Sequence, residues 1–260
     1  MARVTSRKVH VLPCGAEDCD KGFLTLLKDC GTILRIPYHA YLIQDPEALI
    51  LVDTGCSIHW KELHPKELLA SYPIHLSEDE HLDNTLKSIG VSPDDIDYVI
   101  NTHLHYDHCG NNGMFPNATF IVSEVELAHA LSPGWWESAY IPAVFDLPHL
   151  KYQKLRGEFE LIPGVKILPT PGHSEGHQSA LIELERTGTL ILAGDSIFLR
   201  ENLDTPILGM YVNASEYVHS MEMLKHIVTL QKATMLLTHS REYLTPHGWS
   251  TLGEGVQYFD

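Results

Sequence analysis

The chain has 260 residues, of which 44% are hydrophobic, and a formal net charge of −16 at pH 7. This length can bury a sizeable core, and the composition is typical of a globular protein. No apolar run in the sequence approaches the roughly 20 residues that cross a bilayer, and a strongly acidic chain repels nucleic-acid phosphates. We therefore expect a single domain over residues 1–260 that acts on neither a membrane nor a nucleic acid.

Cysteine usage and the N-terminus indicate a reducing compartment. The five cysteines are an odd number and include no C-x-x-C pair, which disfavours both a disulfide framework and a structural zinc knuckle. The basic start of the chain has few apolar residues before Pro13, too few for the core of a signal peptide. A cytoplasmic location is therefore expected.

Short apolar, β-branched segments alternate with helical patterns along the chain. The predicted strands are 9–12, 41–44, 48–55, 96–103 and 119–124, followed by FELI, VKILPTPGH, SALIEL, TLILAGDS and TMLLTHS. The predicted helices are 78–89, 123–131 and 214–228, with Ser or Asn near their starts. Strands outnumber helices, and the sequence has no internal repeat or linker. The pattern therefore predicts an α/β fold in which helices cover sheets.

Four of these predicted strands lead directly to a residue that can bind a metal. The segments YVINTHLH, VKILPTPGH, TLILAGD and TMLLTH reach, in this order, His103, His173, Asp195 and His239. Side chains at strand ends stand on rigid elements and can converge on one edge of a sheet. With 17 histidines in the chain, some neighbouring pairs are expected by chance, but a random scatter would not place them repeatedly at strand ends.

The loop NTHLHYDHCGNNG, residues 101–113, holds the densest group of such side chains. His103 and His105 are two residues apart, so in an extended segment both imidazoles point the same way and can reach one ion. Asp107 and His108 follow after a turn and are placed for a second ion. Nitrogen-rich sites bridged by a carboxylate suit Zn²⁺ best, although Fe, Mn and Co accept the same ligand types.

These motifs resemble those of the metallo-β-lactamase superfamily. LILVDTGC, THLHYDHCG, PTPGHSEGHQS, LILAGDSIF and LLTHS occur here in that superfamily's order, over about residues 38–240. The resemblance implies an αββα sandwich with two divalent metal ions at one edge. It assigns His103, His105 and His173 to the first metal, assigns Asp107, His108 and His239 to the second, and makes Asp195 the bridge. It also implies that Asp53 orients a ligating histidine through a hydrogen bond.

Within that superfamily, the chain is most similar to N-acyl-homoserine lactonases and related small lactonases. The resemblance implies quorum quenching by hydrolysis of a small-molecule lactone, in which a metal-bridging hydroxide attacks the ring carbonyl and Asp107 shuttles the proton. Hydrolysis of another cyclic ester, a cyclic amide or a thioester is the main alternative. An iron-dependent oxidoreductase on the same fold is a weaker one. The sequence does not decide whether the chain forms a homodimer.

One position departs from the lactonase pattern. Those enzymes usually carry a tyrosine three residues after the bridging aspartate, where its hydroxyl donates to the substrate. Here that position is Phe198. Either the metals alone stabilise the developing oxyanion, or another group such as Tyr211 reaches the substrate, or the substrate differs. The departure leaves hydrolysis as the expected chemistry and the substrate open.

Residues outside the motifs are expected to shape the substrate pocket. The segment 131–150 is rich in aromatic residues and proline, so Trp135, Trp136, Tyr140 and Phe145 are candidates for its wall. The segment 14–31 could form another wall, although a plain surface loop is the favoured interpretation. We expect His177 to support the site without ligating. Small buried Cys56 and Cys109 are expected to fill space.

Overall fold

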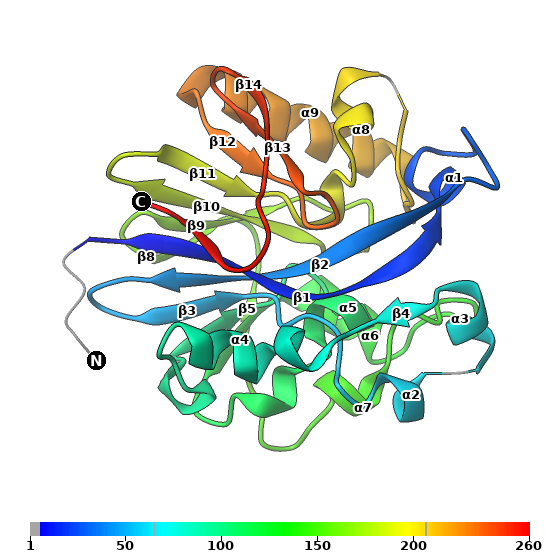
Figure 1. The fold of residues 1–260 in the computed structure, drawn as a ribbon, viewed down its shortest axis with the longest axis horizontal. Helices are drawn as coiled ribbons and strands as arrows, with labels where there is room; N and C mark the ends of the chain where they lie inside the picture. Colours follow the sequence, from blue (N-terminus) through cyan, green and yellow to red (C-terminus); the bar gives the residue numbers. More distant parts are fainter. Residues whose placement is uncertain (1–5, 65, 206) are drawn as a thin grey trace.

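The computed structural model describes residues 6–64, 66–205 and 207–260. Two β-sheets pack face to face, and helices cover the outer face of each sheet (Figure 1). This αββα sandwich is the predicted architecture. None of the helices within the described ranges is long and apolar enough to cross a membrane.

The first sheet is mixed and contains both the longest strands and the N-terminal one. Its order is β15-β1-β2-β3-β5-β6-β7, with β4 also paired to β1. The strands are β1 Lys8–Asp20, β2 Ile33–Gln44, β3 Leu49–Val52, β4 Ile74–His75, β5 Tyr98–Ile100, β6 Thr119–Ser123, β7 Lys151–Leu155 and β15 Gln257–Phe259.

The second sheet is formed by the C-terminal half of the chain, in the order β14-β13-β12-β11-β10-β9-β8. Its strands are β8 Phe159–Ile162, β9 Val165–Pro169, β10 Gln178–Leu184, β11 Gly188–Leu192, β12 Thr234–Leu236, β13 Glu242–Thr245 and β14 Gly248–Thr251.

Most helices are short, and they divide between the two outer layers (Figure 1). The helices near the first sheet are α1 Lys21–Leu24, α2 Trp60–Leu63, α3 Lys66–Ser71, α4 Leu82–Ser88, α5 Tyr106–Cys109, α6 Glu124–Ala130 and α7 Pro142–Phe145. The helices over the second sheet are α8 Arg200–Asp204 and α9 Ala214–Gln231. The 3₁₀ turns are η1 Glu78–Glu80, η2 Pro93–Asp95, η3 Asn112–Met114 and η4 Gly194–Ser196.

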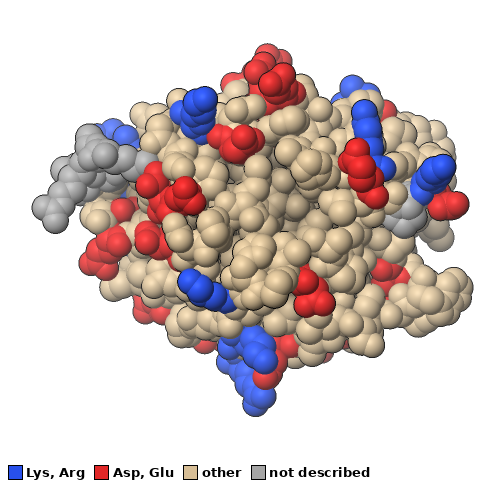
Figure 2. All heavy atoms as spheres, turned by 90° about the horizontal axis from the view of Figure 1, so that it is seen from below, with Lys and Arg blue, Asp and Glu red and all other residues tan. Residues whose placement is uncertain are grey.

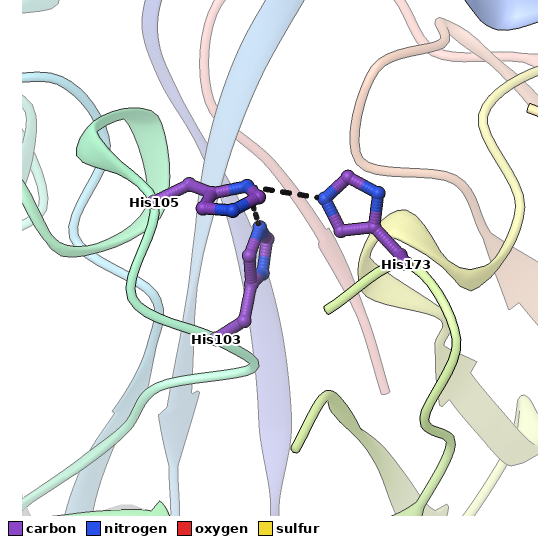
Figure 3. A group of neighbouring side chains, drawn as sticks. All are labelled: His103, His105 and His173. Atoms are coloured by element: carbon purple, nitrogen blue, oxygen red, sulfur yellow. Dashed lines mark hydrogen bonds between the residues drawn. The ribbon is translucent and has the colours of Figure 1, made fainter. Parts of the chain in front are cut away.

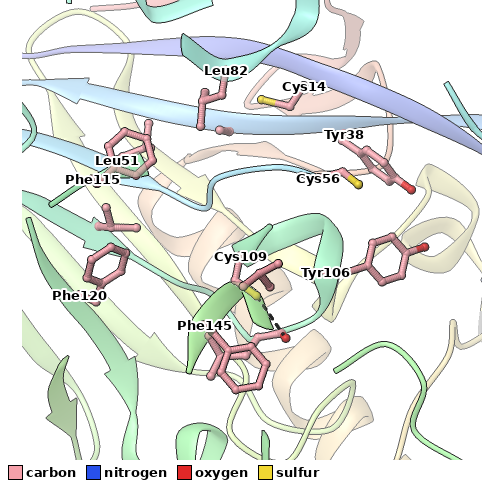
Figure 4. Close-up of a cluster of buried hydrophobic side chains, with 14 of the residues drawn as sticks. Cys14, Tyr38, Leu51, Cys56, Leu82, Tyr106, Cys109, Phe115, Phe120 and Phe145 are labelled. Atoms are coloured by element: carbon pink, nitrogen blue, oxygen red, sulfur yellow. Dashed lines mark hydrogen bonds between the residues drawn. The ribbon is translucent and has the colours of Figure 1, made fainter. Parts of the chain in front are cut away.

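Alternation along the strands builds separate cores on the two faces of each sheet. In β2, Tyr41 and Ile43 face the layer between the sheets, whereas Tyr38 and Leu42 face the helices below. Figure 4 shows this lower layer, where Cys56 and Cys109 are buried among aromatic rings. The prediction that these two cysteines fill space is confirmed.

Strand directions bring several carboxyl ends to one edge of the sandwich. β3, β5 and β6 are parallel, and β1 runs the same way because both β1 and β3 pair antiparallel with β2. In the second sheet, β9, β11 and β12 share one direction. The segments that follow these strands therefore meet at the edge where the site lies.

The predicted elements are largely present, but several have different bounds; the strand predicted at 41–44, for example, begins at Ile33, and the strand predicted at 96–103 is Tyr98–Ile100. The first strand extends to Asp20 instead of ending near residue 12, because a bulge after Pro13 lets β1 stay paired with β2 past the proline. The predicted helix 78–89 is a 3₁₀ turn and then α4, since His81 between them has the non-helical angles φ −59° and ψ 129°.

Charged side chains are dispersed over the face drawn in Figure 2. Lys and Arg stand there singly or in small groups, with Asp and Glu between them. The whole chain has 34 acidic residues against 18 basic ones. On this face, a nucleic-acid backbone would meet no continuous basic surface among the described residues.

Candidate metal centre

Three histidines from two segments form the first half of the site (Figure 3). His105 Nδ1 lies 3.0 Å from His103 Nε2 and 3.1 Å from His173 Nε2. His103 and His105 come from the loop after β5, and His173 comes from the loop after β9. The three nitrogens point toward one another, as ligands of a single ion would.

Asp107, His108 and His239 form the second half. His108 Nε2 lies 3.3 Å from His239 Nε2, and one oxygen of Asp107 lies 3.4 Å from each of these nitrogens. Asp107 and His108 stand on the short helix α5, whereas His239 follows β12. The second set of ligand atoms is therefore assembled from both sheets.

The carboxylate of Asp195 lies between the two halves. Its Oδ2 is 3.3 Å from His173 Nε2 and 3.9 Å from His103 Nε2. Its Oδ1 is 3.2 Å from the Nε2 atoms of both His108 and His239. One oxygen faces each half, which is the arrangement of a bridging ligand. We call these seven residues the metal-ligand cluster: His103, His105, Asp107, His108, His173, Asp195 and His239.

Hydrogen bonds on the outer side of the imidazoles determine which nitrogen faces inward. The Nδ1–H groups of His173 and His239 donate to the carbonyl oxygens of Met210 and Pro37, at 3.1 and 3.0 Å. A carbonyl only accepts, so these rings carry their proton on Nδ1 and turn the Nε2 lone pair toward the cluster. This is the orientation that metal-binding histidines need.

The donor set fits divalent metal ions. Within the part of the chain that the structure describes, the buried Oδ1 of Asp195 has no hydrogen-bond partner, and such an orphaned acceptor is costly. His105 Nδ1 can carry only one proton, which it can direct at Nε2 of either His103 or His173. The Nε2 atom of the other histidine then receives no hydrogen bond from His105. A cation in each half would satisfy these atoms, and imidazole with carboxylate is a ligand set that Zn²⁺ favours.

The two halves differ in their electrostatics. Burial, followed by the neighbouring imidazoles, holds the pKa values of His103 and His105 well below the usual value. Burial also acts to lower the pKa of His239, but Asp195 and then Asp107 outweigh it and raise this pKa to about 9. The first half thus offers neutral imidazoles, and the second offers imidazoles paired with carboxylates.

Asp53 supports the cluster from behind, as predicted. Its Oδ2 accepts a hydrogen bond from His108 Nδ1 at 2.8 Å, and the carboxylate also accepts from the Thr102 backbone N–H and hydroxyl. The Asp53 backbone has φ 57°, a left-handed conformation that costs an aspartate about 1 kcal/mol or more. The strained backbone aims this carboxylate at the ligand.

His177 supports Asp195, as predicted. Its Nε2 accepts a hydrogen bond from the Asp195 backbone N–H at 3.0 Å, while Nδ1 lies 3.1 Å from the Thr170 carbonyl. A Cβ on Gly194 would stand 2.5 Å from this Nε2. Glycine is therefore required at 194 for the ring to reach the bridging residue.

Glu126 is a supporting residue that the sequence analysis missed. It is fully buried and accepts hydrogen bonds from Leu104 N–H at 2.9 Å, Ser174 Oγ–H at 2.7 Å and Gly176 N–H at 3.0 Å. It thereby ties the loop of His103 to the loop of His173. The only signal was its third position after Ser123, which predicted a helix start and not a tertiary contact.

A cavity of about 240 Å³ opens over the cluster. His105, Asp107, His173, Asp195 and His239 form its floor. Most of its walls are apolar or aromatic; these residues are Leu24, Ile36, Tyr72, Tyr106, Trp136, Ala139, Phe198, Met210, Tyr211 and Val212. The remaining wall residues are polar, namely Glu17, Glu137 and Ser138. Such a mixture of apolar walls and few polar groups is typical of a small-molecule site.

Phe198 lies directly against ligands of both halves. Its ring stacks on His239 at 5.8 Å and meets His173 edge-on at 5.3 Å. It is buried among Cys19, Leu24 and Ile36. At the position where lactonases usually carry a tyrosine hydroxyl, this chain places an apolar ring. Tyr211 lines the same cavity and is 38% exposed.

The pocket residues predicted from the segment 131–150 need correction. Trp136 lines the cavity. Trp135 is 93% exposed and does not line the cavity, whereas Phe145 is fully buried in the core beneath the first sheet. Tyr140 is buried and donates to Glu126 at 3.1 Å. An aromatic-rich segment does not reveal which rings face a cavity.

The preference for a surface loop over residues 14–31 was also wrong in part. Glu17 and Leu24 line the cavity, because β1 continues to the edge where the site lies. Burial, and then Asp107, raises the pKa of Glu17 to about 7, against the opposing hydrogen bonds of Tyr106 and Tyr38. The N-terminal strand therefore contributes an acidic group to the cavity.

Comparison with known proteins assigns the family. A sequence model of the metallo-β-lactamase superfamily matches residues 35–239. The chain belongs to the metallo-β-lactamase superfamily. N-acyl homoserine lactonase AiiA of Bacillus thuringiensis subsp. kurstaki is 32% identical over 243 residues, which cover 92% of this chain and 95% of that protein. N-acyl homoserine lactonase AttM of Rhizobium johnstonii is 30% identical over 272 residues, covering 98% and 100%.

Solved structures agree with this superfamily assignment. An N-acyl homoserine lactone hydrolase, with the product N-hexanoyl-L-homoserine bound at its catalytic metal centre, has a TM-score of 0.82 and 32% identity. That alignment covers 91% of this chain and 94% of the other. The predicted fold and the predicted enzyme class, a metal-dependent hydrolase, are confirmed.

Proposed function

We propose that this metallo-β-lactamase superfamily member opens the ring of N-acyl homoserine lactones and so quenches quorum sensing. The observation that carries the proposal is the placement of Asp195, whose two oxygens each face one half of the metal-ligand cluster at 3.2–3.3 Å. The lactonases to which the chain is similar support the choice of substrate class. The cavity over the cluster is of a size for a small ring.

The proposed cofactors are two divalent ions, most suitably Zn²⁺. His103, His105 and His173 would hold the first, and Asp107, His108 and His239 the second, with Asp195 shared. When bound, two such ions make hydroxide available at neutral pH and polarise an ester carbonyl.

Asp107 is the proposed proton carrier. Its side chain lines the cavity and is 11% exposed, so it can reach both the ligand side and a bound substrate. Burial acts to raise its pKa, but His108 and then His239 outweigh burial and hold the pKa below the usual range. In the proposed reaction, Asp107 accepts a proton during attack and delivers it to the ring oxygen that leaves.

Phe198 favours a second candidate, the hydrolysis of another small cyclic ester. Its apolar ring occupies the side of the cavity between His173 and His239, where it offers no hydrogen bond to a carbonyl or leaving oxygen. Cyclic amides and thioesters are further alternatives on the same site. A substrate whose leaving oxygen needs little help would suit this arrangement.

The test is ring opening by the full chain after purification in excess zinc. The assay measures metal content together with kcat/KM on N-acyl homoserine lactones, simple lactones, a lactam and a thioester. We expect two metals per chain and the highest kcat/KM on the acyl homoserine lactones. Fewer than two metals with no ring opening contradicts the proposal, and a clear preference for a simple lactone supports the second candidate.

A further inference from the structure

Glu17 is an acidic group in the cavity wall that the proposed mechanism does not use. It stands near the end of β1, is 6% exposed and lines the cavity beside Tyr106 and Asp107. The neighbouring wall is apolar, with Leu24, Ile36 and Phe198. A buried carboxylate in such surroundings is costly unless it is hydrogen-bonded.

Two tyrosine hydroxyls satisfy only one of its oxygens. Tyr38 Oη–H and Tyr106 Oη–H both donate to Oε2 of Glu17, at 2.5 and 2.6 Å. Figure 4 shows the two tyrosine hydroxyls pointing to the same side of the core between the first sheet and its helices. Oε1 makes no hydrogen bond with any residue that the structure describes. The tyrosines therefore orient the carboxylate and leave one acceptor for another partner.

The orientation of this carboxylate decides what it can recognise. Both hydroxyl protons are directed to Oε2, so Tyr106 has no proton to offer a substrate and does not replace the hydroxyl absent at Phe198. A hydrogen bond to a charged acceptor is about twice as strong as a neutral one. If a substrate fills the cavity without offering a hydrogen-bond donor, Oε1 of Glu17 is left unpaired.

We propose that Glu17 is a specificity-determining residue whose Oε1 accepts a hydrogen bond from a donor next to the scissile ring of the substrate. The inference rests on the proposed lactone hydrolysis and narrows its substrate class. In N-acyl homoserine lactones the donor is the amide N–H. A ring without such a donor leaves the Glu17 carboxylate desolvated and unpaired, which selects against that ring.

The test uses two lactones that differ in one group. N-hexanoyl homoserine lactone carries the amide N–H, and its analogue with oxygen in place of the amide nitrogen does not. Ring-opened product is measured at pH 8, above the pKa of about 7 for Glu17, with the zinc-loaded wild-type protein and with Glu17→Gln. In the variant, the amide oxygen takes over the tyrosine protons, and its NH₂ faces the substrate. Glu158→Gln, at an exposed position outside the cavity, is the matched control.

We expect the wild-type protein and the control to prefer the amide lactone by at least about tenfold in kcat/KM, and the ratio in Glu17→Gln to fall toward one. Unchanged metal content shows that the variant keeps its site. An equal fold-loss of kcat/KM on both lactones means that Glu17 only positions Tyr106, and an unchanged kcat/KM on each lactone means that Glu17 does not contact the substrate. Either result overturns the inference and leaves the proposed lactone hydrolysis standing. If the wild-type protein opens neither ring, the proposed function fails and the inference falls with it.

Discussion

The metal-ligand cluster and the cavity wall above it are held in place by different forces. Several of the ligands are aligned by a hydrogen bond from behind, such as His108 by Asp53, His173 by the Met210 carbonyl and His239 by the Pro37 carbonyl. The wall is held mostly by packing, and its members range from buried Phe198 to Trp136, which is 68% exposed. The contrast teaches that the chemistry depends on directional contacts, while the choice of substrate depends on shape and on one oriented carboxylate.

The strongest test of this contrast removes the bridging ligand. In Asp195→Asn, one oxygen becomes an amide nitrogen that cannot ligate, so one metal should be lost and ring opening should fall at least about 100-fold on every substrate. Metal analysis and kcat measurements check this. Asp146→Asn, at an exposed position, is the control and should keep both metals. A variant at 195 with two metals and normal activity would show that Asp195 is not a bridge.

A smaller effect on metal binding is expected from Asp53, which does not ligate but hydrogen-bonds to the ligand His108. Asp53→Asn replaces the acceptor for the His108 N–H and should weaken metal binding by about 10- to 100-fold. Competition with a chelator measures this change. The ratio of activities between substrates should stay the same, because Asp53 is buried beneath the cluster and does not line the cavity. A changed ratio would argue that the two regions are not separate.

A third test concerns His39, a buried histidine outside the cluster. Its Nδ1–H donates to the Thr238 carbonyl at 2.8 Å, and burial lowers its pKa to about 4. The unfolded chain takes up this proton near pH 6.5, but the folded chain does so only near pH 4. This histidine therefore contributes stability above pH 6.5 that is lost as the pH falls from 6.5 to 4, by roughly 3 kcal/mol.

Denaturant unfolding at several pH values checks this against His39→Gln, whose amide can keep the bond to Thr238. The variant should lose less stability on acidification than the wild-type protein. The other buried histidines titrate in both proteins, so the difference between them isolates His39. Parallel curves for the two proteins would contradict the assignment.

The smallest effects separate two neighbouring tryptophans. Trp136 lines the cavity, so Trp136→Ala should raise KM severalfold, by about 1 kcal/mol of lost apolar contact. Trp135 is 93% exposed, and Trp135→Ala should change stability by less than about 0.5 kcal/mol and leave KM unchanged. Steady-state kinetics on both variants give the comparison. Equal changes in KM would mean that the two rings act as one unit.

Residues of the cluster were predictable because their positions follow local rules. His103 and His105 alternate in an extended segment, and His173, Asp195 and His239 each follow a predicted strand. His177 and Asp53 were predicted as supporting residues, and their hydrogen bonds agree. The strand ends indicated that these side chains converge, and the resemblance to the metallo-β-lactamase motifs completed the set.

Residues of the wall were predictable only in part. Phe145 and Trp135 share the aromatic character of Trp136, yet one is in the core and the other in solvent. Glu17 gave no signal, because it stands beside Asp18 and Asp20 in a charged segment that is typical of a protein surface. Its place in the cavity depends on a bulge after Pro13 that extends β1 and on two tyrosines distant in the chain.

By itself, the sequence determined the sandwich fold and the seven side chains of the metal-ligand cluster, because its motifs resemble those of the metallo-β-lactamase superfamily and four of these residues follow predicted strands. Only the tertiary structure decided which oxygen of Asp195 faces which half, that Glu126 ties two loops together, and that Glu17 presents one oxygen to the cavity. Those features arise from contacts between segments far apart in the chain, and no local pattern specifies them.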